Sequence, residues 1–273
     1  MKTAQFRKIV WDFYRKHGRH NLPWRKTRDP YRILVSEIML QQTQVDRVVS
    51  YYENFLKKFP TVEKLAHAKT SDLLKAWQGL GYNRRALHLQ RAAQAVVSEY
   101  GGKFPKTYDE LLKLPGVGPA TAGDLMAFAY NEPAVVLETN IRQVFFHHYF
   151  PAALTRGDKP CKIFDKDVAP LVEKTLDTKN PREWYWALMD YGTHLKKLHG
   201  NIAHRSAHYT KQSKFRGSNR ELRSNILKLV LEKSRSEQEI LKLLESPAPD
   251  IQKNLIALKK EGLLTFSRNR YST

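Results

Sequence analysis

Glu37 is the first candidate for chemistry, because it is the single acid in a largely apolar run, residues 31–40. The run has the composition of a buried helix, and burial makes an ionised carboxylate costly, so we expect the pKa of Glu37 to rise. A carboxyl group that keeps its proton near neutral pH can act as a general acid. The alternative is that Glu37 lies on a solvated stripe of its helix or caps a neighbouring helix, and composition alone favours this alternative.

Amide side chains directly after this run favour the chemical interpretation. Gln41 and Gln42 belong to a dense group of glutamines that can both donate and accept hydrogen bonds. Such groups could fill the space left in a stack of nucleic-acid bases and pair with the orphaned base. Tyr82 directly follows a glycine turn, so we expect it on a loop, where its ring could wedge between bases. The alternative is that Tyr82 is an ordinary core aromatic.

A glycine-rich turn begins the stretch from Leu114 to Asn140. Gly116 and Gly118 supply the backbone freedom for a hairpin so tight that side chains would obstruct it, and Pro119 suits the first turn of a new helix. The unpaired amides at the start of that helix form a site for a phosphate. The residues expected to contact it are Gly116, Val117, Gly118, Ala120 and Thr121. A lone hairpin of this kind can also be a clamp without catalysis.

A second carboxylate, Glu138, follows an apolar run at residues 135–137 and is expected at the start of a helix. Asn140 comes two residues later. The order of helix, glycine hairpin, helix, apolar run and acid therefore brings a phosphate site and an acid into one stretch of chain.

The composition indicates a polyanionic partner. The chain has 273 residues with 47 Lys and Arg against 27 Asp and Glu, a formal net charge of +20 that exceeds what solubility requires. Neither end has an amphipathic basic anchor, so nucleic acid fits better than a membrane surface. The single cysteine, Cys161, excludes an intrachain disulfide framework and any four-cysteine zinc or iron–sulfur site. The N-terminal residues lack the apolar core of a signal peptide, so we expect an intracellular protein.

Helical periodicity runs through most of the chain and must position these residues. Apolar residues recur at helical spacing in segments 6–14, 31–40, 45–55, 65–77, 86–97 and 168–176. Thr107 and Glu110 have the spacing of a capping box for the helix that leads into the hairpin. No segment before the last twenty residues alternates convincingly as a strand would. An all-α fold is therefore expected.

The pattern of the sequence changes at Ser218, where short helices with their own capping signals begin, as expected at a domain boundary. Capping boxes are predicted for Ser218 with Glu221 and for Ser236 with Glu239. Three short helices and a basic hairpin are predicted to follow, an order typical of a winged helix.

Several motifs, in this order, resemble the adenine DNA glycosylases of the MutY type in the helix-hairpin-helix (HhH-GPD) superfamily. They are LPWR at 22–25, SEIMLQQTQV at 36–45, FPTVEKLA at 59–66, GLGYNRRA at 79–86, GKFP at 102–105 and LPGVG at 114–118. The resemblance extends from about residue 6 to about residue 195. It implies an all-α, two-domain fold, with a discontinuous helical domain (1–22 plus 134–216) and a six-helix domain with the hairpin (23–133). The winged-helix-like module (217–273) predicted from the residues themselves follows these two domains.

The resemblance also implies a monofunctional glycosylase that flips a base out of double-stranded DNA and hydrolyses its N-glycosidic bond. Glu37 would protonate the departing base, Glu138 would stabilise the positive charge developing on the sugar, and Asn140 would lie near the deoxyribose. The cleft would lie between the two domains, with Glu37 and Glu138 on opposite sides. The residues holding the gap in the DNA would be Gln41, Gln42 and Tyr82.

Departures from the family affect what the resemblance implies. Lys196, Ala203, Ser206 and Gln212 stand where the cysteines of its iron–sulfur loop would fall, so no cluster is expected. A monovalent cation at the hairpin is the one cofactor that the resemblance leaves open. The family's larger domain for inspecting oxidised guanine is expected to be missing, because too few residues follow. Glu138 stands where the family has aspartate, and an extended glutamate would place its carboxylate about 1 Å deeper.

Adenine is the expected base, because in the family the acid matching Glu37 reaches a purine ring nitrogen. The alternatives are a thymine or uracil mismatch glycosylase and a lesion-binding protein with weak or no catalysis. Ala120 stands where related enzymes that also cleave the strand carry a lysine, so no lyase activity is expected. We expect a monomer that binds double-stranded DNA in the cytoplasm of a prokaryotic-type cell, at the nucleoid, and that binds no membrane.

A metal site is not expected. His204 and His208 are spaced like two ligands on one helix, but no third ligand is evident. His147 and His148 are adjacent, hence on diverging faces, and are interpreted as structural.

Overall fold

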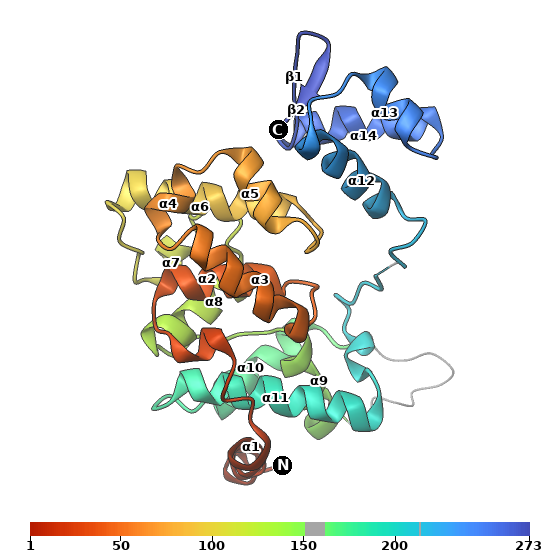
Figure 1. Ribbon diagram of the computed structural model, residues 1–273. Coiled ribbons are helices and arrows are strands. Elements are labelled where there is room, and N and C mark those ends of the chain that lie inside the picture. The colour runs from red at the N-terminus through yellow and green to blue at the C-terminus, as the bar shows by residue number, and fades with distance from the viewer. Residues whose placement is uncertain (151–161, 213) are drawn as a thin grey trace. The chain divides into compact units, whose positions relative to one another are not determined.

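The computed structural model describes residues 1–150, 162–212 and 214–273. Nearly all regular secondary structure of the described chain is helical, as Figure 1 shows, and two short strands form a hairpin at its C-terminal end. The all-α prediction is therefore confirmed. No helix of the described residues combines the length and the apolar character that crossing a membrane needs.

The described residues form two compact units. The first comprises residues 1–34, 106–113 and 117–211, and the second comprises residues 35–105, 114–116 and 212–273. The predicted division into 1–22 plus 134–216, 23–133 and 217–273 places its boundaries elsewhere and stays a prediction.

In the first unit, helix α11 packs against α9 and α1 around an aromatic core. The ring of Phe6 lies 5.2 Å from that of Phe145 and 6.0 Å from that of Trp184, centroid to centroid, and all three side chains are buried. These contacts explain why the first helix joins a unit built mostly from later residues. The elements are α1 (Thr3–His17), η1 (Pro23–Lys26), α7 (Tyr108–Leu111), α8 (Pro119–Leu125), η2 (Met126–Tyr130), α9 (Thr139–Tyr149), α10 (Asp165–Thr175), α11 (Pro181–His199) and η4 (Ile202–Arg205).

In the second unit, α4 packs along α6 and α3 packs against α5. Phe55 and Trp77 pair edge to face in this core, with ring centroids 5.9 Å apart, and both are fully buried. Helix α2 (Pro30–Leu40) begins in the first unit and ends in the second. The other elements are α3 (Val45–Lys58), α4 (Val62–Ala66), α5 (Thr70–Trp77), α6 (Arg84–Tyr100), α12 (Asn219–Glu232), α13 (Glu237–Leu243), α14 (Ala248–Lys260), β1 (Thr265–Ser267) and β2 (Arg270–Ser272).

The last elements of the second unit have the order predicted for a winged helix. Helices α12, α13 and α14 are followed by the antiparallel pair β1 and β2, in which Phe266 lies opposite Tyr271. The two residues between the strands, Arg268 and Asn269, both have positive φ (48° and 60°), as a tight two-residue hairpin turn requires. A bridge between Arg235 and Tyr271 ties the hairpin to the chain ahead of α13.

The predicted helix caps differ in outcome. Ser236 and Glu239 form the capping box expected at the start of α13, which confirms that prediction. The box predicted at Ser218 is wrong, because its hydroxyl donates to the Phe215 carbonyl, while Glu221 accepts from the Gly217 amide. At α7, the Thr107 hydroxyl accepts from the Glu110 amide as predicted, but it also donates to the Glu110 carboxylate, 2.6 Å away.

Candidate active site

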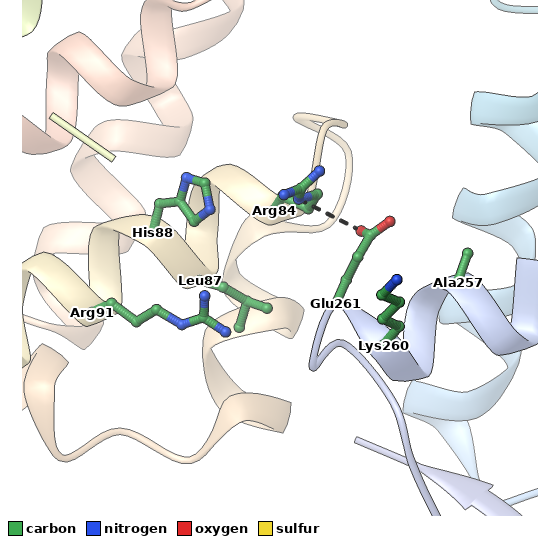
Figure 2. Close-up of a pocket in the computed structure, with 7 residues that line it drawn as sticks. All are labelled: Arg84, Leu87, His88, Arg91, Ala257, Lys260 and Glu261. Atoms are coloured by element: carbon green, nitrogen blue, oxygen red, sulfur yellow. Dashed lines mark ion pairs between the residues drawn. The ribbon is translucent and has the colours of Figure 1, made fainter. Parts of the chain in front are cut away.

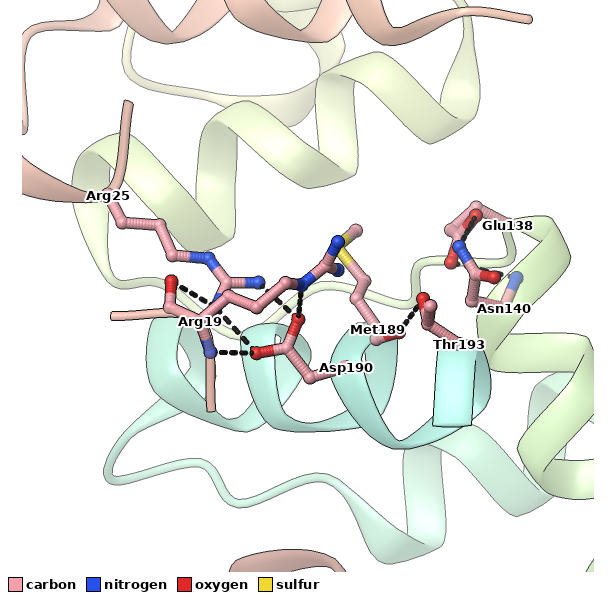
Figure 3. Close-up of polar contacts among 7 residues, drawn as sticks. All are labelled: Arg19, Arg25, Glu138, Asn140, Met189, Asp190 and Thr193. Carbon is pink, nitrogen blue, oxygen red and sulfur yellow. Dashed lines mark hydrogen bonds and ion pairs between the residues drawn. The ribbon is translucent and has the colours of Figure 1, made fainter. Parts of the chain in front are cut away.

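Glu138 caps the N-terminus of α9 with its own side chain. Its Oε1 accepts hydrogen bonds from the amides of Asn140 (2.9 Å) and Ile141 (3.1 Å), and its Oε2 accepts from Asn140 Nδ2 at 3.4 Å. Figure 3 shows Glu138 beside Asn140. The longer acid is therefore folded back onto the helix and not extended, so the expectation of a deeper carboxylate is not met. The expectation that Glu138 starts a helix is confirmed.

Burial is the main influence on this carboxylate and raises the pKa of Glu138. The amides of Asn140 and Ile141 and the positive charge of Arg142 act in the opposite direction without cancelling it. A helix N-terminus favours negative charge, so the site can hold the anion once the proton is lost. Glu138 is therefore a preorganised acid that, once ionised, can stabilise positive charge on a group placed beside it.

The apolar run ahead of Glu138 is fixed by two residues that the sequence did not mark. The hydroxyl of buried Tyr185 accepts from the Val136 amide (3.2 Å) and donates to the Ala134 carbonyl. At Gly123, a Cβ would lie 2.9 Å from a methyl of Val136, so only glycine fits without a shift. Both contacts set the path of the chain into Glu138.

Gly192 of α11 allows the same close approach on the other side. A Cβ there would lie 2.1 Å from the carbonyl oxygen of Asn140, closer than real side chains allow. Helix α11 and the first turn of α9 can therefore meet only because residue 192 is glycine. An isolated glycine inside a helical pattern is the one sequence signal that could have indicated this contact.

Asp190, two residues earlier on α11, anchors the loop that carries the LPWR motif. Its buried carboxylate accepts from the backbone amide (2.7 Å) and Nε (2.6 Å) of Arg19 and from both terminal nitrogens of Arg25 (2.8 and 3.0 Å), as Figure 3 shows. Burial alone would raise the pKa of Asp190, but Arg25 and then Arg19 hold it below its usual value. The ion pairs of Asp190 with Arg19 and Arg25 are thus a structural anchor beside the candidate site.

Replacing Asp190 by asparagine should therefore cost about 3 kcal/mol of stability at neutral pH, because it leaves the Arg25 guanidinium buried without its counter-charge. The depressed pKa makes this contribution fully present above about pH 4, the unfolded value, and lost as the pH falls through the folded value. Denaturant unfolding of both proteins across this range measures the difference. The control is Asp12→Asn, which removes an exposed ion pair with Lys8 on α1 and should change stability little. A loss of stability as large as that of Asp190→Asn would contradict the role of Asp190 as a structural anchor.

Of the two glycines in the hairpin, Gly116 has a backbone conformation that requires glycine and Gly118 does not. Gly116 has φ +79°, and a Cβ there would lie 2.5 Å from the Cβ of His88, so glycine is required. Gly118 has φ −96°, and a Cβ there would meet nothing within 4 Å, so the expectation that side chains would obstruct the hairpin at both positions is wrong for Gly118. Open space at Gly118 instead leaves its backbone accessible to a ligand.

The remaining hairpin residues divide into anchors and exposed positions. Pro119 begins α8 as predicted. Val117 and Thr121 are each 6% exposed, so any contact they make with a ligand would come from their backbone amides, whereas Ala120 is exposed. The predicted phosphate contacts of these residues stay predictions.

The second unit carries the other candidate residues. Glu37 is partly exposed between buried neighbours on α2, and Gln41 is exposed just past its end. Gln42 and Tyr82 both have positive φ (55° and 48°), an uncommon conformation for residues other than glycine that is frequent at functional sites. Tyr82 is 37% exposed on its loop, so it is not a core aromatic.

Gln42 and Tyr82 both contact Gln212, a residue that the sequence analysis did not associate with them. Gln212 Nε2 donates to the Tyr82 hydroxyl (2.6 Å) and lies 3.4 Å from Gln42 Oε1. Arg220 Nη1 also donates to the Tyr82 hydroxyl, at 3.1 Å, with its guanidinium over the ring. Gln212 and the first turn of α12 therefore contact the loop that was expected to enter the DNA.

Arg85 positions these loops and was missed by sequence reasoning. Its guanidinium donates to the carbonyls of Ile38 (2.8 Å) and Met39 (3.1 Å) at the end of α2 and to those of Leu80 (3.1 Å) and Gly81 (3.0 Å) before Tyr82. One side chain thus links the segment leading to Gln41 with the turn leading to Tyr82. Burial lowers the pKa of Arg85 to about 10, which still leaves it charged at neutral pH.

Replacing Arg85 by alanine should leave these carbonyls unsatisfied and reduce stability by about 1.5–3 kcal/mol, the range for hydrogen bonds to a charged group. The affinity expected for duplex DNA should fall with it, because the two loops lose their common support. Arg85→Lys keeps the charge but cannot reach all the carbonyls, so we expect it to rescue only a small part. Denaturant unfolding and fluorescence anisotropy measure the two effects, and an unchanged affinity would show that the loops need no such support.

Comparison with known proteins adds to this geometry. A model of the HhH-GPD superfamily of base excision DNA repair proteins matches residues 35–162. A solved thermostable thymine-DNA glycosylase is 30% identical with a TM-score of 0.60, and the match covers 70% of this chain and 87% of that chain. The chain belongs to the HhH-GPD superfamily.

The HhH-GPD chain is also similar to curated adenine DNA glycosylases. That of Buchnera aphidicola subsp. Baizongia pistaciae is 35% identical over 196 residues, which are 70% of this chain and 53% of the relative. That of Mycolicibacterium smegmatis is 40% identical over 178 residues, 64% of this chain and 58% of the relative. The chain spans about half the length of the curated relatives it matches. A solved endonuclease III–DNA complex, 20% identical with a TM-score of 0.56, shares the fold.

The HhH-GPD match extends over Glu37, Gln41, Gln42, Tyr82, the hairpin and Glu138, and ends before α11. Glu138 and Asn140 lie together in the first unit, and Gln42 and Tyr82 lie together in the second. The predicted cleft joins residues of different units and stays a prediction.

The histidines of this HhH-GPD chain form no metal centre in the described residues, where no group of three or more His, Cys, Asp or Glu side chains could hold an ion. The helical spacing assumed for His204 and His208 is wrong, because His204 lies in the short turn η4, which ends at Arg205. His148 Nε2 lies 3.0 Å from the Tyr191 hydroxyl, and burial lowers the pKa of His148 to about 4, as suits a structural residue. Cys161 lies outside the described residues.

Proposed function

We propose that this HhH-GPD protein is a monofunctional DNA glycosylase that excises adenine from mismatched or damaged duplex DNA. The observation that carries the proposal is the carboxylate of Glu138, held at the start of α9 beside Asn140. Relatives at 35% and 40% identity named adenine DNA glycosylase support the choice of base. The protein acts as a monomer on DNA.

In the proposed reaction, the target nucleotide leaves the stack at a cost of a few kcal/mol, and Gln41, Gln42 and Tyr82 occupy the gap. Glu37 donates its proton to a ring nitrogen of the base as the bond between base and sugar breaks. The electron pair of that bond leaves with the base, and the ionised Glu138 stabilises the positive charge left on the sugar. Water then adds to the sugar carbon and loses a proton, which leaves an abasic site.

The product should be an uncleaved abasic strand, because Ala120 offers no amine to attack the sugar. In related enzymes with lyase activity, a lysine at this place forms a covalent bond to the sugar carbon. Borohydride reduction would trap such a bond. Trapping in high yield with this protein would contradict the monofunctional assignment.

Single-turnover assays on a panel of mismatched duplexes test the substrate. We expect release of adenine and no release from duplexes that contain only thymine or uracil mismatches. A second candidate is supported by the solved thymine-DNA glycosylase, which this chain matches over 87% of its length. Release of thymine without adenine would favour that candidate, and tight binding without any release would favour a lesion-binding protein.

A further inference from the structure

A groove of about 370 Å³ lies in the second unit between α6 and the end of α14. Helix α6 contributes Arg84, His88 and Arg91, and the other wall contributes Lys260 and Glu261 (Figure 2). Nothing in the proposed reaction uses this groove. Its lining holds three cationic side chains and one carboxylate, so it is electropositive.

Two of the cations, Arg84 and Arg91, lie with His88 on one face of α6. Arg84, His88 and Arg91 are four and three residues apart, a spacing that places them in one row on a helix. With a rise of 1.5 Å per residue, Arg84 and Arg91 are about 10 Å apart along the helix axis. One strand of DNA carries a negative charge about every 3.4 Å of its axis, so the row is long enough to meet more than one phosphate.

The single carboxylate of the groove, that of Glu261, already has an ion-pair partner outside the groove, Arg223. Glu261 Oε2 lies 2.6 Å from Arg223 Nη2, in a partly buried pair between α12 and the end of α14, and 3.9 Å from Arg84 Nε. The Arg84 side chain is 63% exposed, so its contact with Glu261 is weak and easily exchanged. Among the described residues, neither Arg91 nor Lys260 has a carboxylate partner.

His88 is partly buried in the groove, beside Arg84 and Arg91. Burial first, and then the charges of Arg84 and Arg91, lower the pKa of His88. The imidazole is therefore neutral at neutral pH, where it can serve as a hydrogen-bond donor to an anion.

The groove lies between two elements of the proposed DNA interface. A Cβ on Gly116 would lie 2.5 Å from the His88 Cβ, so the glycine hairpin rests on the groove's own histidine. Arg84 follows Tyr82 by two residues, at the start of α6. A DNA strand that met both the hairpin and the Tyr82 loop would pass along this row of cations.

We propose that this groove binds phosphates of the DNA backbone through Arg84, Arg91 and Lys260, with α14 supplying the last of these. The ligand class is a phosphodiester anion, and the proposal rests on the glycosylase function proposed above. On binding, Arg84 exchanges its weak contact with Glu261 for a phosphate, while Arg223 retains the carboxylate. The C-terminal helices thereby complete a DNA surface that begins on α6.

The test compares the salt dependence of duplex binding in the full-length protein. Arg91→Ala combined with Lys260→Ala removes one cation from each wall and breaks no ion pair. Each lost phosphate contact should reduce the slope of log K against log salt by about 0.9, so we expect a reduction of about 1.8. The matched control, Lys57→Ala with Lys64→Ala, removes the same charge from exposed positions on α3 and α4 and should leave the slope nearly unchanged.

A slope equal to that of the wild type in the groove variant, or an equal loss in the control, would overturn the proposal. Methylphosphonate linkages, placed singly around the mismatch, provide a second measurement. Neutral linkages at contacted positions should weaken the wild type and leave the groove variant unaffected. If no linkage does so and inorganic phosphate alone shifts the His88 ring resonances, the groove binds a free anion and the DNA assignment fails.

The outcome can be separated from that of the proposed function. The salt slopes are measured by equilibrium binding, which needs no base release. Absence of release by the wild type would refute the glycosylase and leave the comparison of slopes interpretable.

Discussion

Replacing Glu138 by glutamine should reduce base release to background, a loss of about 10³-fold in the single-turnover rate, the scale for removing one preorganised electrostatic group. Glutamine is nearly isosteric, and its Oε1 can keep both bonds from the amides of Asn140 and Ile141, because the carboxylate receives both on one oxygen. The change therefore removes the charge and leaves the cap of α9. Rapid-quench assays with excess protein measure the chemical step directly.

Glu138→Asp is the matched control, because it keeps the charge and aspartate is a favoured helix cap. The carboxylate moves back by one methylene, and a displacement on the order of 1 Å can cost about 10²-fold when geometry limits the reaction. We expect a rate lower than wild type and above that of the glutamine variant. A many-fold higher rate would instead mark the natural protein as a weakened enzyme and favour lesion binding.

The raised pKa of Glu138 gives this prediction a pH dependence. The carboxyl must lose its proton before it can stabilise positive charge, so release should increase as the pH rises through that value. Stability should follow the opposite course, because a raised folded-state pKa contributes stability below the unfolded value that is lost as the pH rises through the folded one. Glu138→Gln should accordingly become more stable than the wild type toward high pH in thermal unfolding.

Local sequence rules predicted the elements that bear the candidate site. Pro119 at the start of α8, Glu138 at the start of α9 and Tyr82 on an exposed loop all follow from the chemistry of individual residues and their neighbours. These features depend on backbone preference within a few residues. Such preferences can be read along the chain without knowledge of its tertiary contacts.

The contacts that position those residues could not be predicted in this way. Arg85 binds carbonyls at the end of α2, and Gly192 meets the Asn140 carbonyl, so each acts through a partner more than forty residues away. Two local predictions were wrong. Gly118 has an ordinary φ with open space where a Cβ would be. Ser218 turns its hydroxyl back to Phe215, because competing local bonds decide which way a small polar residue faces.

Replacing Glu37 by glutamine should lower base release by about 10²-fold or more, the usual contribution of a general acid, while folding and DNA binding stay nearly intact. Glutamine keeps the size of the side chain and a hydrogen-bond donor, but it has no proton to give up. The control is Glu53→Gln, an exposed acid on α3 in the same unit, which should leave the rate unchanged.

The effect must also depend on the leaving group if Glu37 transfers a proton. A base analogue that departs readily without protonation needs less help from an acid, so Glu37→Gln should slow its release far less than that of adenine. Equal losses for both bases would mean that Glu37 positions the nucleotide. A fully active glutamine variant would remove Glu37 from the mechanism, and the proton would then have to reach the base from solvent.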